Sequence, residues 1–237
     1  MQHDAILNID IKTMHNAEKN IASAVERLNR ILPLTARHRA LDSPLQRLHT
    51  AILHAYIDHG RSLTRNEMAV YVDDIDEAVK ILQRDDLVVF NDDGEPVGAY
   101  PFTMEQRDHL VTVNGHTLHC MCALDALAVA PMFDLSTRIR SRCHVTNDAI
   151  TIHQTGRNAP KQKNTSPLYF GINWSAASVN SCCANSLCTE MIFLKNDSVA
   201  NSWLGEAPEQ RQVFPLHDAI EFAARFFVPL IREESLD

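Results

Sequence analysis

The apolar residues in the first part of the chain recur at the spacing of an α-helix. One stripe ends at Pro33, a residue that stops helices, and its members are Ala17, Ile21, Ala24, Leu28 and Ile31. After a short polar link, Ser43 and Pro44 predict the start of a second helix, with the serine as N-cap and the proline in the first turn. Gly60 predicts the end of that helix.

A further helical segment is followed by a hairpin pattern. Thr64 and Glu67 have the spacing of a capping box, in which each side chain hydrogen-bonds to the backbone of the other residue. The next stretch places four apolar side chains on one helical face, namely Ile75, Ala78, Val79 and Leu82. Asp93-Gly94 then separates two short β runs, which is a strong hairpin signal.

Three helices followed by a hairpin are typical of a winged helix-turn-helix. We therefore predict a winged-helix-like domain at residues 41–100, preceded by a helical extension at residues 1–40. Residues 61–96 carry ten acidic and four basic side chains, a net charge of −6, which would repel phosphates. This charge argues against DNA as a partner and favours a winged-helix fold that serves as a scaffold.

The second half of the chain, residues 101–237, mixes strand and helix patterns. Asn114-Gly115 predicts a hairpin, and residues 146–148 predict a turn between two further strands. An apolar helix is expected from Cys122 to near Pro131. Two more strands are expected at 166–174 and 189–196, and two more helices at 196–206 and 216–231. The prediction is an α+β fold, with a mixed β-sheet core and flanking helices behind the N-terminal region.

Composition is that of a soluble globular chain. The 237 residues are 45% hydrophobic and 22% charged, and the net charge is −8. No apolar run approaches the roughly 20 residues of a membrane span, and the N-terminus lacks the pattern of a signal peptide. We expect a cytoplasmic protein with no membrane partner.

All six cysteines lie in the second half of the chain, at positions 120, 122, 143, 182, 183 and 188. In a reducing cytosol they are expected to be thiols, and their spacing is not that of a structural zinc site. Cys122 and Asp125 would share one face of the apolar helix, because residues three apart are neighbours there.

A thiolate beside a carboxyl could bind a soft electrophile and give it a proton. The alternative is a buried cysteine that acts as a small hydrophobe and an aspartate that caps a helix. Cys143, in an alternating strand, is predicted to be structural. Cys182 and Cys183 would point in opposite directions in an extended strand.

Three blocks in order, CALDALAVAP, TRIRSRC and LCTEMIFLKNDSVANSW, resemble the alkylmercury (organomercurial) lyases. The resemblance spans roughly residues 43–230, and it implies a winged-helix-like region before the core. It matches Cys122 to the first catalytic cysteine and Asp125 to the catalytic aspartate of the family. Cys143 matches a cysteine that the family treats as structural.

The third block is expected to supply the second catalytic cysteine. Cys188 lies fifteen residues before Trp203 and fits the family spacing, whereas Cys182 and Cys183 fit it less well. Cys122 and Cys188 are therefore the expected metal ligands, with Cys183 as a further candidate. The cysteines at 120, 182 and 183 lie outside the family pattern. They would bind additional metal, protect the site or signal a shifted substrate.

The resemblance implies protonolysis of a carbon–mercury bond, giving a hydrocarbon and Hg(II), without an organic cofactor. Two thiolates would hold the mercury and Asp125 would relay the proton, which requires the three side chains to meet in one dry pocket. The implied partners are a small organomercurial, low-molecular-weight thiols that release Hg(II), and a mercuric reductase that accepts it. The biological role would be mercury resistance and detoxification.

Two functions from other classes stay open at this point. One is a soft-metal-binding or trafficking protein without turnover, which the extra cysteines favour but which has no use for a proton relay at Asp125. The other is a metal-responsive winged-helix regulator, against which the acidic helical region counts.

Overall fold

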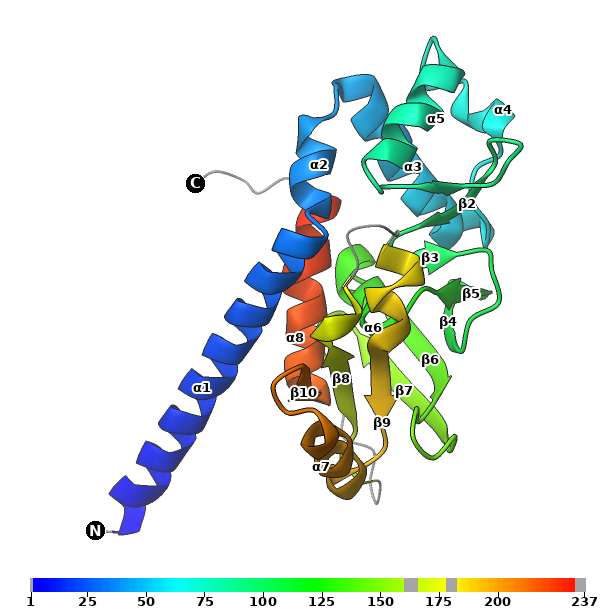
Figure 1. The fold of residues 1–237 in the computed structure, drawn as a ribbon. Coiled ribbons are helices and arrows are strands. Elements are labelled where there is room, and N and C mark those ends of the chain that lie inside the picture. The colour runs from blue at the N-terminus through cyan, green and yellow to red at the C-terminus, as the bar shows by residue number, and fades with distance from the viewer. Residues whose placement is uncertain (1, 160–165, 178–182, 233–237) are drawn as a thin grey trace.

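The protein combines a helical N-terminal part with a core of two sheets around one buried helix (Figure 1). The computed structural model describes the backbone of residues 2–159, 166–177 and 183–232, and within these ranges the side chains from residue 16 onward. The α+β class predicted from the sequence is confirmed, but the predicted mixed β-sheet core is wrong, because the strands pair antiparallel in both sheets.

The long helix α1 (Gln2–Ile31) packs along α8 (Leu216–Phe227), and its N-terminal part extends past the body of the molecule (Figure 1). Its predicted apolar stripe is confirmed, because Ile21, Ala24 and Leu28 are buried. Burial of such side chains is worth about 1.5–3 kcal/mol for a large aliphatic residue, so the stripe holds α1 on the core.

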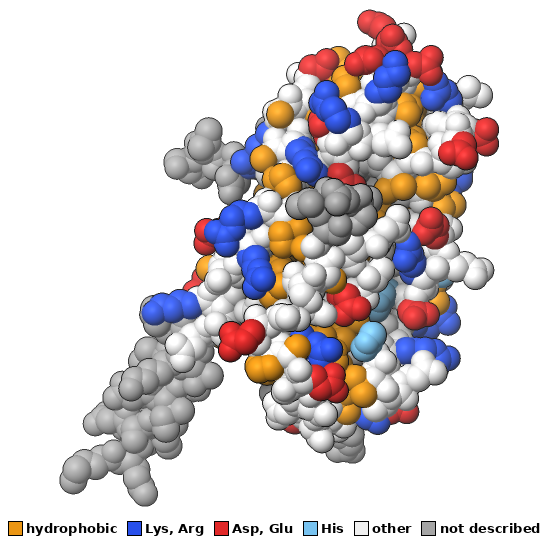
Figure 2. Space-filling view, in the orientation of Figure 1, with side chains coloured by type: hydrophobic (Ala, Val, Ile, Leu, Met, Phe, Trp, Pro, Cys, Tyr) orange, Lys and Arg blue, Asp and Glu red, His pale blue; other side chains and the backbone are white. Residues whose placement is uncertain are grey.

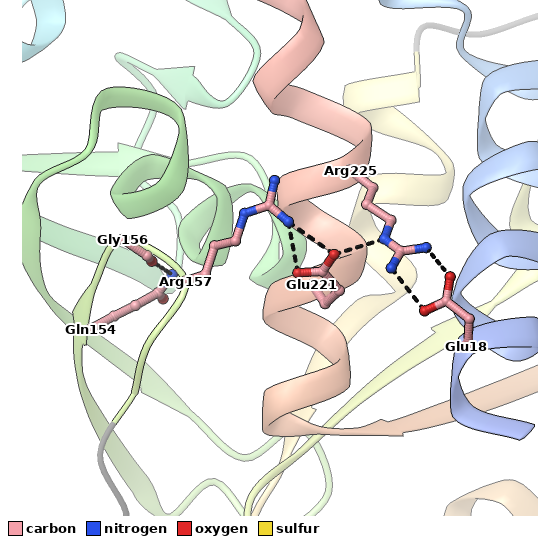
Figure 3. Close-up of polar contacts among 6 residues, drawn as sticks. All are labelled: Glu18, Gln154, Gly156, Arg157, Glu221 and Arg225. Carbon is pink, nitrogen blue, oxygen red and sulfur yellow. Dashed lines mark hydrogen bonds and ion pairs between the residues drawn. The ribbon is translucent and has the colours of Figure 1, made fainter. Parts of the chain in front are cut away.

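A chain of ion pairs lies beside this apolar contact (Figure 3). Arg225 of α8 binds Glu18 of α1, with N–O distances of 2.5 and 2.8 Å, and also Glu221 at 2.7 Å. Glu221 in turn accepts hydrogen bonds from Arg157 at 2.8 and 2.9 Å. These groups are partly or largely exposed, so the pairs add little stability. The Arg225–Glu18 pair links α8 to α1, and the Arg157–Glu221 pair links the core to α8.

The next elements occur in the predicted order of helices and hairpin. Gly60 ends α3 in the left-handed region (φ 70°), and the Thr64–Glu67 capping box is present. The predicted N-cap Ser43 is wrong by one residue: the Asp42 carboxylate accepts the Leu45 N–H at 2.9 Å and caps the helix in its place. The elements are α2 (Leu34–Ala40), α3 (Ser43–His59), α4 (Arg65–Met68), α5 (Ile75–Arg84), β1 (Val89–Phe90) and β2 (Pro96–Ala99). That this segment is a winged helix stays a prediction.

The larger sheet has the strand order β1-β2-β3-β5-β4-β6-β7, and every pair in it is antiparallel. The predicted hairpin at Asn114-Gly115 is confirmed, with positive φ values of 48° and 82°. The predicted strand pair around 146–148 is confirmed as β6 and β7. The remaining strands are β3 (Phe102–Thr103), β4 (His109–Val113), β5 (His116–Cys120), β6 (Ser136–Arg142) and β7 (Ala149–Thr155).

A smaller antiparallel sheet, in the order β10-β8-β9, forms the other side of the core. It meets the larger sheet at a parallel bridge between Cys143 and Phe193. Two 3₁₀ turns, η2 and η3, precede β9. The elements are β8 (Tyr169–Asn173), η2 (Cys183–Asn185), η3 (Leu187–Glu190), β9 (Met191–Leu194), α7 (Asp197–Glu206) and β10 (Arg211–Pro215).

Helix α6 (Ala123–Phe133) lies between the sheets and is buried from Ala123 to Met132. It contacts β4, β6, β7, β9 and α8. The predicted end near Pro131 is confirmed to within two residues, since the helix ends at Phe133. Pro131 has no N–H for the carbonyl of Leu127, and the Gln154 side chain donates to that oxygen at 2.9 Å instead. This substitute partner lets the helix run on to Phe133.

Among the helices of the described ranges, none combines the length and the apolar character that a membrane crossing requires.

The packing of α7 on β8 gives a testable prediction about stability. A Cβ added at Gly171 would lie 2.9 Å from the Trp203 ring and 3.2 Å from Leu194, and Trp203 is buried. Gly171→Ala should therefore lower the free energy of unfolding by about 1–3 kcal/mol, the usual cost of overpacking. Gly205→Ala is the matched control, since nothing lies within 4 Å of its added Cβ. Urea denaturation that finds equal stabilities for the two variants would contradict this packing.

Candidate active site

The site begins at the N-terminus of α6, where Cys122 is the N-cap. Its backbone is extended (φ −153°, ψ −178°), and its sulfur accepts the Asp125 N–H at 3.4 Å. Cysteine here occupies the place that serine, threonine or aspartate usually takes. The cap fixes the sulfur over the first helical turn, and Asp125, three residues on, projects from that same turn.

Cys188 reaches the same place from the other side of the core. Its sulfur, the Cys122 sulfur and a carboxylate oxygen of Asp125 all lie within 4.8 Å of one another, and all three residues are buried. The predicted convergence of these three side chains is therefore confirmed as geometry. The strand expected at 189–196 is present as β9 (Met191–Leu194), and Cys188 lies before it in the 3₁₀ turn η3.

Asp125 is almost fully enclosed, with 1% of its surface exposed. Within the part of the chain that the structure describes, neither carboxylate oxygen makes a hydrogen bond of normal geometry, and the nearby Cys122 thiol only partly offsets the effect of burial on the pKa. A charged carboxylate without partners is costly in an apolar interior. Burial accordingly raises the pKa of the Asp125 carboxyl to about 7, so near neutral pH the group can both take up and release a proton.

Both thiols of the cluster are neutral at physiological pH. Burial raises the pKa of Cys122 to about 12, although contacts with Cys188 and with the Asp125 N–H oppose this shift. A helix N-terminus normally favours thiolate, but burial is the larger effect here. Contacts with the thiols of Cys122 and Cys183, together with burial, raise the pKa of Cys188 well above its ordinary value. The resting site therefore holds two S–H groups beside the carboxyl.

A thioether in the site was not predicted from the sequence. The Cys122 thiol donates to the Met191 sulfur at 3.5 Å, so Met191 adds a third soft atom beside the cluster. Met191 follows Cys188 by three residues, and a 3₁₀ turn brings residues at that spacing together. The sequence places Met191 in the strand expected at 189–196 and carries no signal for the 3₁₀ turn before it.

The other cysteines have different places. Cys183 lies in η2, with its sulfur 3.8 Å from that of Cys188. Cys120, at the end of β5, is fully buried outside the cluster, and burial raises its pKa well above the ordinary value. Cys143 is buried directly after β6 and forms the bridge to Phe193, apart from the cluster. Cys182 lies outside the described residues.

The chemical capacity of the cluster follows from its atoms. Thiolates are soft ligands and bind soft metal ions in preference to hard ones. A carboxyl whose pKa lies near the working pH is an effective general acid. Two thiols and such a carboxyl around one point can therefore hold a soft electrophile and protonate a group bound to it.

Two comparisons with known proteins agree on a family. The family model described as alkylmercury lyase matches residues 102–228, more than half of the chain. The alkylmercury lyases of Bacillus cereus and Clostridium butyricum are each 27% identical over 164 residues, which is 68% of this chain and 72% of theirs. That of Pseudomonas putida is 28% identical over 119 residues, 50% of this chain and 54% of the relative.

A solved structure shows the same fold. The crystal structure of the mercury-bound form of MerB2 has a TM-score of 0.66 to this chain and covers 84% of it and 98% of its own length, at 20% identity. At this identity the likeness concerns the fold. The family model spans α6, η3 and β9, the elements that carry the cluster. On this evidence the chain belongs to the alkylmercury lyase family.

Proposed function

We propose that this protein cleaves the carbon–mercury bond of organomercurials by protonolysis, with Cys122 and Cys188 as mercury ligands and Asp125 as the proton carrier. One observation carries the proposal: two buried sulfurs and an enclosed carboxyl lie within 4.8 Å of one another. Family membership supplies the substrate class. A site built only to bind the metal would gain nothing from an enclosed carboxyl with a pKa of about 7.

The first step is capture of the substrate by thiol exchange. An organomercurial arrives as R–Hg–SR′, where R′ belongs to a small thiol. One site thiol forms a sulfur–mercury bond and its proton leaves with the displaced thiolate as R′SH. Because the site thiols are neutral at rest, capture adds no net charge to the buried pocket.

The second step moves a proton onto Asp125. The other thiol of the pair binds mercury and gives its proton to the carboxylate, which lies within 4.8 Å of both sulfurs. Mercury then has two sulfur ligands and one carbon ligand. The second sulfur pushes electron density toward the carbon, which becomes basic enough to accept a proton.

The third step breaks the carbon–mercury bond. The Asp125 carboxyl gives its proton to the carbon, the bonding electrons go with the carbon, and R–H leaves. Hg(II) stays on the two thiolates and the carboxylate is regenerated, so atoms and charge balance. The protein's own side chains supply every group in these steps, and we propose that no organic cofactor takes part.

Release of Hg(II) needs an acceptor, because a buried pair of thiolates holds it tightly. We propose that low-molecular-weight thiols remove it by exchange, and that a mercuric reductase takes it onward in a cytoplasmic detoxification route that confers mercury resistance.

For the N-terminal part we propose an extension at 1–40, a winged-helix scaffold at 41–100 and a catalytic core at 101–237. Figure 2 shows acidic side chains gathered at the end of the molecule that carries α4 and α5. The exposed acidic residues there are Asp73, Asp74, Asp76 and Glu77. A face of this charge repels phosphates and supports a scaffold over a DNA-binding role.

Removing any one of the three proposed groups should stop catalysis. Cys122→Ser, Cys188→Ser and Asp125→Ala should each slow benzene release from phenylmercury by at least about 100-fold, the lower range for loss of an acid–base group. Cys143→Ser is the matched control and should mainly lower stability, because the smaller hydroxyl underfills a position that is 1% exposed. Full activity of Cys188→Ser beside an inactive Cys183→Ser would show that the second thiol is assigned wrongly.

The buried carboxyl should make stability depend on pH. The Asp125 pKa is about 7 in the folded protein against 3.8 for the free group, so the unfolded chain loses this proton first as pH rises. Wild-type stability should therefore fall between pH 4 and pH 7, by up to about 4 kcal/mol. Asp125→Asn is neutral throughout and should gain stability relative to wild type over that window. A stability difference that is the same at pH 4 and pH 8, measured by urea denaturation, would argue against a raised pKa.

Thiol exchange should limit turnover. Without added thiol, phenylmercury should give a single burst of about one benzene per protein, because Hg(II) stays on the two thiolates. With millimolar thiol, turnover should continue. Gas chromatography of the headspace measures both. Sustained turnover without thiol would mean that Hg(II) leaves by another route.

A further inference from the structure

Cys183 is a buried thiol that the three proposed steps do not use. It lies in η2, is 5% exposed, and its sulfur accepts the Cys188 S–H at 3.8 Å. Cys188 therefore contacts a thiol in η2 and also lies in the cluster with Cys122 and Asp125. Through this shared sulfur, Cys183 adjoins the proposed mercury site.

The position of Cys183 is fixed by contacts from other parts of the fold. The N–H of Ala184 donates to the hydroxyl of the buried Tyr100 at 2.9 Å. The N–H of Cys183 reaches the Asp86 carboxylate at 3.5 Å, and Arg107 donates to the Asn185 side chain at 3.3 Å. The first two contacts seat the turn against the N-terminal part and the third ties it to the core segment before β4, so the third sulfur occupies a defined place.

A buried cysteine often acts only as a small hydrophobe, but this one has a sulfur neighbour that is itself a proposed ligand. Contacts with the Cys122 and Cys183 thiols are the two leading causes of the raised Cys188 pKa, so Cys188 interacts with the thiols of both residues. After the carbon leaves, Hg(II) keeps two sulfur ligands and can accept a further one. A soft donor next to one of those sulfurs is suited to this role.

We propose that Cys183 is the third sulfur ligand of product Hg(II), completing a three-thiolate site with Cys122 and Cys188. The inference rests on the proposed function for its sequence of events. In this step the Cys183 S–H bond breaks, a sulfur–mercury bond forms, and the proton goes to the Asp125 carboxylate, which has just lost its own proton to the carbon. No electrons are transferred, and both the charge and the atoms of the site are conserved.

A third ligand gives Hg(II) a way out of the pocket. Cys183 is the most exposed of the three cysteines, at 5% against 3% for Cys188 and 1% for Cys122. Three-coordinate mercury also lies on the path of thiol exchange, in which an entering sulfur binds before another leaves.

X-ray absorption at the mercury edge tests the proposal without any lyase step. Reduced protein receives one equivalent of HgCl2 and is freed of small thiols. Wild type should show three sulfur neighbours, Cys183→Ser two, and the control Cys143→Ser three. Two sulfurs in wild type, or an unchanged count in Cys183→Ser, would overturn the proposal. Two sulfurs in wild type would overturn the proposal even if Cys183→Ser failed to fold. Met191→Leu removes the other soft atom beside the cluster and should keep three sulfur neighbours; a count of two in that variant would also overturn the proposal.

A competition assay provides a second, independent test. The assay compares the affinity for Hg(II) of two variants in the presence of a competing dithiol. Cys122→Ser keeps Cys188 and Cys183, whereas Cys122→Ser/Cys183→Ser keeps only Cys188. The first variant should bind Hg(II) at least about 10-fold more tightly, since two linked sulfurs chelate the metal more strongly than one binds it. Equal affinities would refute the third ligand. Hg(II) is added directly in both tests, so they can succeed when phenylmercury yields no benzene, a result that would refute only the lyase proposal.

Discussion

The enclosed carboxyl of Asp125 is the constraint on which the site depends. It sits in the first turn of α6, and in the described part of the structure neither oxygen makes a hydrogen bond of normal geometry. Stability alone would favour an apolar residue or a partnered carboxylate there. What the arrangement provides is a proton carrier whose pKa is near 7, held beside two sulfurs. Enclosure of the Asp125 carboxyl therefore both lowers the stability of the fold and gives the group the pKa that the proposed chemistry needs.

The fold brings this carboxyl and its thiols together from two separate parts of the chain. Helix α6 supplies Cys122 and Asp125, and its burial between the sheets excludes water from its first turn. Cys188 comes from η3, directly before β9, and the small sheet holds it there through the pairing of β9 with β8. The bridge between Cys143 and Phe193 joins the two sheets, which gives Cys143 a place in the architecture outside the cluster.

The local sequence pattern predicted much of the fold and the proximity of two site residues, Cys122 and Asp125. The spacing of Cys122 and Asp125 was sufficient to place them together, because a helical turn is a local structure. The proximity of Cys188, 66 residues after Cys122, depends on tertiary packing, and it was expected only from the family resemblance. Short elements escaped prediction for a similar reason: η2, η3 and β10 have three to five residues and carry too little periodicity. Cys183 lies in η2 and Met191 directly follows η3, so their contacts with the Cys122–Asp125–Cys188 cluster depend on those turns.

Protonation of carbon is the central claim, and its most direct test is the isotopic composition of the hydrocarbon. Purified protein would be incubated with methylmercury and excess thiol in D2O, and the headspace analysed by mass spectrometry. The account predicts monodeuterated methane in amounts equal to the Hg(II) formed, because the proton that reaches carbon comes from exchangeable S–H and carboxyl groups. Methylmercury that stays intact on the protein, with no methane in the headspace, would contradict it and identify a binding protein.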